Sequence, residues 1–307
     1  MTVYKPEGAL ISTPSNIAAL KSQAALKDAF LSGKILEARA VSCDPSHNLV
    51  LDLGCMKGVI PRAEAAIGIE EGDVRDIAII SRVNKPTCFK ILCFAQDKNG
   101  EPYAVLSRRA VQEECKVQYI DNLKTGDIIP VTITRLEPFG CFVDIGCGII
   151  SMIPIDFISI SRISHPSDRF YNGQNIYAVV KSIEENGKIT LSHKELLGTW
   201  EQNANNFKIG ETVSGIVRSI ENYGVFVELT PNLAGLAEPK DSVCVGQLAS
   251  VYIKNLIPEK MKVKLIIIDS FFAEYSQKEP KYYFESNHID RFVYSPECSL
   301  KTIETIF

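Results

Sequence analysis

Residues 124–149 read KTGDIIPVTITRLEPFGCFVDIGCGI, and residues 208–233 read KIGETVSGIVRSIENYGVFVELTPNL. Laid over each other, the two stretches keep one offset, 208 minus 124 or 84 residues, from end to end. A fixed offset that matches both aromatics and glycines indicates an internal repeat, and a repeat decides the architecture before any motif does. The matched pairs are Gly126 with Gly210, Phe139 with Tyr223, Gly140 with Gly224, Phe142 with Phe226, Val143 with Val227 and Ile145 with Leu229.

A third, fainter copy lies upstream of these two. VLDLGCMKGVIP (50–61) matches FVDIGCGIISMIP (142–154) through the DLG/DIG turn, and one residue of slippage then aligns the two IP pairs. VLSRR (105–109) matches TLSHK (190–194) in the same way. The chain is therefore predicted to hold three copies of one module of roughly 70–80 residues.

Each copy has the pattern of a small β-barrel. In the second copy the segments IIPVTITRL, CFVDIG, IISMIPI, NIYAVVKSI and GKITLSHK are short β-branched runs separated by Gly, Pro or polar turns, which is typical of strands. Five such strands in so short a module fit an OB-fold, a five-stranded Greek-key barrel. The predicted fold class is all-β, with three tandem five-stranded OB-fold barrels joined by short helical linkers.

The connectors between the copies read as helices. The segment 14–33 has Ser15 as a candidate N-cap, an apolar stripe and Gly33 as a stop. The tail is acidic but rich in aromatics, too apolar for a disordered segment, so we expect it to pack on the third copy or to bind a partner. The predicted domains are an N-terminal helical segment 1–33, a degenerate first barrel 34–109, a second barrel 124–195, a third barrel 208–268 and a C-terminal extension 269–307.

Composition excludes several classes of protein. Of the 307 residues 46% are apolar and 23% charged, as in ordinary globular domains. No apolar run approaches the roughly 18 residues that a membrane span needs, and the N-terminus lacks a signal pattern. The nine cysteines are odd in number and form no CxxC pair, which favours reduced thiols in the cytoplasm without a metal site. The net charge of −4 excludes only a strongly basic nucleic-acid binder.

The repeated motif resembles the S1 RNA-binding module of the bacterial ribosomal protein S1 family. The likeness covers roughly residues 33–268 and is best in the second copy, whereas the third lacks the closing LSxK and reads MKVKLIIID at that place. The resemblance implies single-stranded RNA binding, in translation or on mRNA, with the ribosome as a further partner. The second-copy residues that carry it are Gly126, Phe139, Gly140, Phe142, Val143, Asp144, Gly173, Lys188, Leu191, Ser192 and Lys194.

The two rings of the second copy raise a problem of strand parity. Phe139 and Phe142 are three residues apart, and such positions face opposite sides of a strand. Gly140 permits a bulge or sharp twist that would bring both rings to one surface, where they could stack on unpaired bases. The alternative is that Phe139 plugs the barrel end. Tyr223 and Phe226 repeat the arrangement in the third copy, which favours stacking.

Charged residues complete the predicted site. By the resemblance, Glu184 and Lys188 supply an acid and a base near the last strand, and Arg135 lies near the first ring. Arg218 is the corresponding cation of the third copy. For each of these the alternative is a solvated surface charge.

The copies are predicted to be unequal. The family often has a histidine after the third strand, where this sequence has Pro154 in the second copy and Glu238 in the third. A carboxylate there repels phosphate, so the third copy should bind more weakly. The register places His47 and Val50 where the first copy should carry its rings.

The sequence offers no catalytic constellation and no cofactor motif. HExxH, GxSxG and P-loop patterns are absent, and the four histidines (47, 165, 193 and 288) lack partners at ligand spacing. Two functions therefore remain: a single-stranded RNA binder, or a non-catalytic scaffold of degenerate barrels that binds proteins. Salt dependence separates them, because phosphate contacts weaken steeply with salt.

Overall fold

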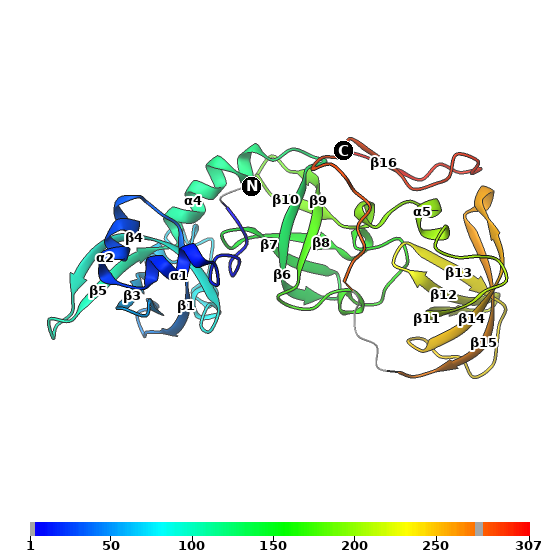
Figure 1. Ribbon diagram of the computed structural model, residues 1–307, viewed down its shortest axis with the longest axis horizontal. Coiled ribbons are helices and arrows are strands. Elements are labelled where there is room, and N and C mark those ends of the chain that lie inside the picture. Colours follow the sequence, from blue (N-terminus) through cyan, green and yellow to red (C-terminus); the bar gives the residue numbers. More distant parts are fainter. Residues whose placement is uncertain (1–3, 274–278) are drawn as a thin grey trace. The chain divides into compact units, whose positions relative to one another are not determined.

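The computed structural model describes residues 4–273 and 279–307. The chain divides into two compact units, Met1–Leu123 together with Asp144–Ile150, and Lys124–Val143 together with Ser151–Phe307. Three β-barrels follow one another along the chain (Figure 1). The first lies in the first unit and the third in the second, while the strands of the second barrel contribute the turn 144–150 to the first unit.

All three barrels are closed and have five strands with the same order. The first barrel comprises β1 (Leu36–Cys43), β2 (Leu49–Asp52), β3 (Lys57–Ile60), β4 (Pro86–Gln96) and β5 (Pro102–Ser107). The second comprises β6 (Ile128–Glu137), β7 (Gly140–Gly146), β8 (Ile149–Pro154), β9 (Asn175–Ile183) and β10 (Ile189–Ser192). The third comprises β11 (Thr212–Glu221), β12 (Gly224–Thr230), β13 (Leu233–Ala237), β14 (Leu248–Ile257) and β15 (Lys262–Phe271).

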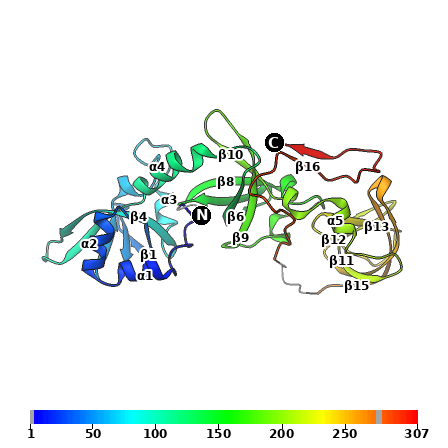
Figure 2. The same ribbon diagram turned by 45° about the horizontal axis from the view of Figure 1, so that its top comes forward.

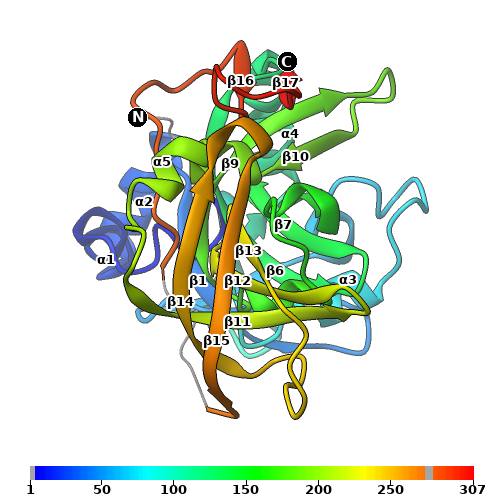
Figure 3. The same ribbon diagram turned by 90° about the vertical axis from the view of Figure 1, so that its right-hand side faces the viewer.

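In each barrel the first strand pairs with the second and fourth, and the third pairs in parallel with the fifth. This is the order of an OB-fold, and it confirms the predicted all-β fold of three five-stranded barrels. A bulge in the long first strand, between Val217 and Ser219 in the third barrel, adds the bend that closure needs. Figure 3 looks onto β14 and β15 of this barrel.

Alternation along the strands builds the cores. In β15 the residues Val263, Leu265 and Ile267 are buried, while Lys264 and Ile266 between them are exposed. The first barrel has its own buried cluster, formed by strand residues together with Leu26 and Ala29 of the N-terminal helices. Each of these two cores is therefore built mainly from inward-facing strand residues, as the pattern predicted.

Helices fill the segments outside the barrels. The segment 14–33, predicted as helical, forms two helices, α1 (Pro14–Leu20) and α2 (Gln23–Leu31). The prediction of Ser15 as the N-cap is wrong. Thr13 and Ser22 cap the two helices with their side-chain oxygens, because Pro14 suits the first helical position and Ser22 starts a new cap. The remaining α-helices are α3 (Ile77–Ile80), α4 (Arg109–Gln118) and α5 (Trp200–Ala204).

The C-terminal tail, orange to red in Figure 2, packs against both barrels of the second unit. Tyr294 is buried in the core cluster of the third barrel, and Tyr282, Phe284, Ile289 and Phe307 pack on residues of the second. A short antiparallel pair, β16 (Arg291–Val293) and β17 (Glu304–Ile306), lies within the tail. The expected packing on the third copy is thus found, together with packing on the second.

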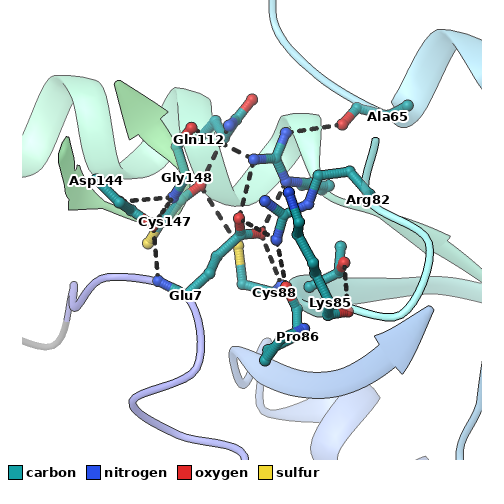
Figure 4. A network of polar contacts seen from close by, with 12 residues as sticks. Glu7, Ala65, Arg82, Lys85, Pro86, Cys88, Gln112, Asp144, Cys147 and Gly148 are labelled. Atoms are coloured by element: carbon teal, nitrogen blue, oxygen red, sulfur yellow. Dashed lines mark hydrogen bonds and ion pairs between the residues drawn. The ribbon is translucent and has the colours of Figure 1, made fainter. Parts of the chain in front are cut away.

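A network of buried charges organises the first unit (Figure 4). The Glu7 carboxylate accepts hydrogen bonds from Arg108 Nε at 2.8 Å and lies 2.7 Å from Arg82 Nη2. The backbone N–H of Glu7 donates to Asp144 Oδ2 at 2.8 Å, and Arg108 donates to the Gly148 carbonyl at 3.3 Å. Because the side chains of Glu7 and Arg108 are almost fully buried, each charge depends on the other for compensation.

None of the helices in the described ranges, 4–273 and 279–307, combines the length and the hydropathy that crossing a membrane requires.

Candidate nucleic-acid interface

The ring pair of the second barrel lies at the β6–β7 hairpin. β6 ends at Glu137 and β7 begins at Gly140, so Phe139 belongs to the tight turn and strand parity does not apply to it. Phe139 is 56% exposed, which excludes the alternative that it plugs the barrel. Phe142 is half-buried, and the two ring centroids are 6.1 Å apart at an interplanar angle of 87°. The hairpin therefore carries an edge-to-face pair on its outer surface.

The third barrel repeats this pair. Tyr223 lies in the β11–β12 turn and is 66% exposed, and Phe226 is half-buried. The ring centroids are 6.2 Å apart at 90°. Two barrels of different sequence thus present an exposed ring and a half-buried ring in the same geometry.

A glycine follows the exposed ring in both hairpins for a steric reason. A Cβ on Gly140, which has a φ of +155°, would lie 2.4 Å from the carbonyl oxygen of Ile153 at the end of β8. Gly224 is in the same position, with a Cβ 2.5 Å from the Ala237 carbonyl oxygen. The carbonyl of Phe139 also accepts a hydrogen bond of 3.0 Å from the N–H of Ile155. These contacts fix the turn against the third strand and hold the exposed ring in place.

Replacing Gly140 by alanine is expected to lower the free energy of unfolding of the second unit by about 2–3 kcal/mol, because the backbone carbonyl cannot move aside cheaply. Gly187→Ala is the matched control, since Gly187 also has a positive φ (+78°) but open space around its Cβ, and it should cost only about 1 kcal/mol. Urea denaturation followed by circular dichroism measures both. Equal losses for the two variants would contradict the proposed steric role.

The strand register shows which residues stand beside the half-buried ring. In the third barrel a row of directly paired residues crosses the sheet. All members of this row are half-buried or exposed, so they share the outer face. The row reads Ser219, Phe226, Leu236 and Lys264.

The second barrel has an equivalent row. Subtracting the repeat offset of 84 from Ser219, Phe226 and Leu236 gives Arg135, Phe142 and Met152, and Thr190 pairs with Met152. Met152, Leu236 and Lys264 were not among the residues predicted from the sequence. Only the pairing register of the third and fifth strands identifies them, and that register cannot be read from a sequence motif.

The predicted charges of the second barrel lie at the edge of this row. Arg135 is exposed and forms an ion pair with Glu137. Lys188 is exposed and lies in the β9–β10 turn, directly before β10. Glu184 stands in the same β9–β10 turn, where its Oε2 accepts a hydrogen bond of 3.1 Å from Asn186. By the repeat offset Arg135 therefore lies beside Phe142, whereas Lys188 lies with Glu184 in the β9–β10 turn.

Arg218 lies elsewhere. Its side chain is 8% exposed, with Nε 2.9 Å from Glu228 Oε2 and Nη1 3.4 Å from Asp168 Oδ2. It occupies the bulge of β11, outside the row of directly paired residues. The exposed cation of the third barrel's row is Lys264, at the position where the second barrel has Thr190.

The first barrel has no ring pair at this hairpin. His47 stands in the β1–β2 turn with a positive φ of 61° and lies 3.7 Å from Asp76. Val50 pairs with Val59 of β3. The prediction that the register leaves the first copy without its rings agrees with these positions.

The described residues contain no group of three His, Cys, Asp or Glu side chains arranged to hold a metal ion. His193 is buried and contacts the Ile158 carbonyl through Nδ1 at 3.0 Å. Burial, together with the nearby charge of Arg169, lowers the pKa of His193 to about 4 although the hydrogen bond to Ile158 opposes this. His193 therefore lies in the interior of the second unit and not on an exposed face.

Comparison with known proteins agrees with the geometry. The family model described as the S1 RNA binding domain matches residues 122–194, the second barrel. A small ribosomal subunit protein bS1 homolog of Bacillus cereus is 30% identical over 97% of this chain and 76% of its own length. The homolog of Bacillus subtilis is 30% identical over 86% of the chain and 66% of its own length.

The small ribosomal subunit protein bS1 of Staphylococcus aureus is 27% identical over 85% of the chain and 68% of its own length. The chain therefore spans about two thirds to three quarters of the length of these relatives. Because the likeness runs through nearly the whole chain and through all three barrels, the chain belongs to the family of the small ribosomal subunit protein bS1.

Proposed function

We propose that this protein binds single-stranded RNA, mRNA in particular, and acts in translation in the cytoplasm in association with the ribosome. The observation that carries the proposal is the pair of exposed rings at the same hairpin of two barrels, in a chain of the bS1 family. The partners follow from that family membership and from the S1 RNA binding domain matched over 122–194.

The chemistry of the two faces suits unpaired bases. An exposed aromatic ring can stack on any base, and a duplex hides the base faces that such stacking needs. Arg135 in the row with Phe142, Lys188 in the β9–β10 turn and Lys264 in the row of the third barrel offer exposed guanidinium and ammonium groups for phosphates. Glu184, in the same turn as Lys188, is an acceptor for base or ribose donors. We propose these residues, together with Phe139, Phe142, Tyr223 and Phe226, as the RNA-binding site.

We further propose that the protein is a binder and not an enzyme, and that it works without a cofactor. The proposal is supported by its relatives, whose names describe ribosomal proteins. In this view Arg218 and His193 support the fold of the second unit, as their burial suggests.

Fluorescence anisotropy tests the function directly. An unstructured oligoribonucleotide should bind more tightly than a hairpin of the same length, and its affinity should fall steeply as salt is raised. Equal affinity for the two RNAs would contradict stacking on unpaired bases. If affinity for RNA is negligible while partner proteins bind with little response to salt, the alternative function as a protein-binding scaffold is correct.

A further inference from the structure

The tail residues 279–307, which we call the clasp, hold the second barrel at two places. The backbone N–H of Ile128 donates to the Asn287 carbonyl at 2.8 Å, and that of Ile289 donates to the Gly126 carbonyl at 2.9 Å. This continues the edge of β6 with clasp backbone. Apolar clasp side chains, Tyr282, Phe284, Ile289 and Phe307, pack on Ile128, Val179 and Leu196.

Between these places the clasp holds the third barrel. Tyr294 is 6% exposed within the core cluster of that barrel, and its hydroxyl donates to the Asn232 carbonyl at 2.6 Å. The carbonyl of Tyr294 accepts from the N–H of Trp200 at 2.9 Å, and the N–H of Leu300 donates to the Glu259 carbonyl at 3.0 Å. One continuous segment is therefore anchored on both barrels.

A buried charge cluster joins the same two barrels independently of the clasp. Glu228 of β12 forms ion pairs with Arg218 of its own barrel and with Arg169 from the loop before β9. Ser161 Oγ of the second barrel also donates to Glu228 at 2.8 Å. The side chains of Glu228, Arg169 and Arg218 are each less than a tenth exposed. Separating the barrels would leave buried charges without partners, which is costly.

Asn232, in the turn between β12 and β13, adds a second junction. It is fully buried, and its amide donates to the carbonyls of Lys194 at 2.8 Å and Gly198 at 2.9 Å. Its Oδ1 accepts from the N–H of Ile160 at 3.1 Å. All three hydrogen bonds of this side chain thus connect the third barrel with the second barrel or with the connector that follows it.

From these contacts we infer that the second and third barrels bind RNA as one rigid body, in which the clasp keeps the two ring pairs at a fixed separation. The inference rests on the proposed function. Rigid placement matters because an RNA that reaches both pairs then loses little further entropy when the second pair engages. With independent barrels the second contact would be made at the lower effective concentration of a flexible tether.

The test compares RNA lengths rather than RNA binding as such. Oligouridylates from about 4 to about 32 nucleotides span the ~4–16 nucleotides that one OB barrel occupies, and twice that range. The quadruple variant Tyr282→Ala, Phe307→Ala, Asn232→Ala, Arg169→Ala removes the clasp contacts, the Asn232 junction and the ion pair between the barrels. It leaves Glu228 paired with Arg218 and changes no residue of the proposed RNA site. Leu300→Ala is the control, because this clasp side chain is 83% exposed.

The wild type and Leu300→Ala should gain affinity sharply once the RNA reaches both ring pairs. The quadruple variant should bind the shortest RNAs within about twofold of wild type, which also shows that its barrels are folded. It should bind the longest at least about tenfold more weakly. Small-angle scattering should show its barrels moving apart.

Two outcomes overturn the inference. In the first, the barrels separate in scattering while the length profile stays that of wild type. In the second, neither the scattering nor the profile changes, so the clasp does not hold the barrels. Failure of the proposed function is a different result, since then the wild type binds no oligouridylate of any length.

Discussion

Changing Phe139 and Phe142 to alanine together is expected to weaken the binding of single-stranded RNA by at least about tenfold. Stacking on an aromatic ring is worth ~1–3 kcal/mol per base, which corresponds to about 5- to 150-fold in affinity. Phe139 is an exposed turn residue, so its loss removes little buried area. Anisotropy with an unstructured RNA measures the effect, and circular dichroism verifies that the variant remains folded.

Two matched changes show whether the effect belongs to this hairpin. Tyr223→Ala with Phe226→Ala should weaken binding less, because the exposed carboxylate of Glu238 directly follows β13 of that barrel and repels phosphate. His47→Ala should change almost nothing, because the first barrel carries no ring pair. A folded Phe139, Phe142 variant that binds RNA like wild type would show that the proposed site is wrong.

The second large effect concerns stability. Glu7→Gln should destabilise the first unit by about 3–5 kcal/mol, because it leaves the buried Arg108 and the partly buried Arg82 without their counter-charge. Glu71→Gln, at an exposed carboxylate, is the control and should stay within about 0.5 kcal/mol of wild type. Urea denaturation at neutral pH gives both values.

The pH dependence of the same variant checks the electrostatic cause. Burial by itself would raise the pKa of Glu7, but the charges of Arg108 and Arg82 outweigh it and lower the pKa to about 2, from 4.5. A lowered pKa means stability that is fully present above pH 4.5 and lost as the pH falls toward 2. The wild type should show this acid limb and Glu7→Gln should lack it.

Asp144, in the same network, works in the opposite direction. Burial and the neighbouring Glu7 charge raise its pKa to about 6, from 3.8. A raised pKa contributes stability that is present below pH 3.8 and lost as the pH rises through 6. In Glu7→Gln this contribution of Asp144 should be smaller, because the Glu7 charge that helps to raise its pKa is gone. If wild type and Glu7→Gln lose stability in parallel between pH 4.5 and 2, the assigned cause is incorrect.

The sequence was sufficient for the fold because the repeat supplied it. The offset between Gly126 and Gly210 is the same as that between Phe139 and Tyr223, so these residues occupy equivalent positions of the repeat. Equivalent positions predict barrels with the same strand order. The boundary of the first helices was not predictable in the same way, because Ser15 and Ser22 are both acceptable caps and only Pro14 favours the earlier start.

The candidate site was predictable only where it is local. Phe139 is exposed because it lies in the two-residue turn between β6 and β7. In the sequence, the neighbouring Gly140 indicated an irregular backbone at this place. The burial of Arg218 depends on Glu228 and on Asp168, a residue of another barrel, and no alignment of repeats shows what packs over a strand. The position of Lys264 was not predicted for a related reason. Lys264 lies beside Leu236 because β13 and β15 pair in parallel, and that pairing joins strands far apart in the sequence.

Asp144 and Glu228 occupy the same position of the repeat, since 228 minus 144 is 84. Each acid pairs with a segment that precedes its own strand in the sequence. Asp144 accepts a hydrogen bond from the N–H of Glu7, and Glu228 forms an ion pair with Arg169. During synthesis the earlier partner is therefore already present when the acid emerges. The order of the modules along the chain is therefore part of the structure. Exchanging two modules would separate each acid from the segment that pairs with it, although every module would keep its own sequence.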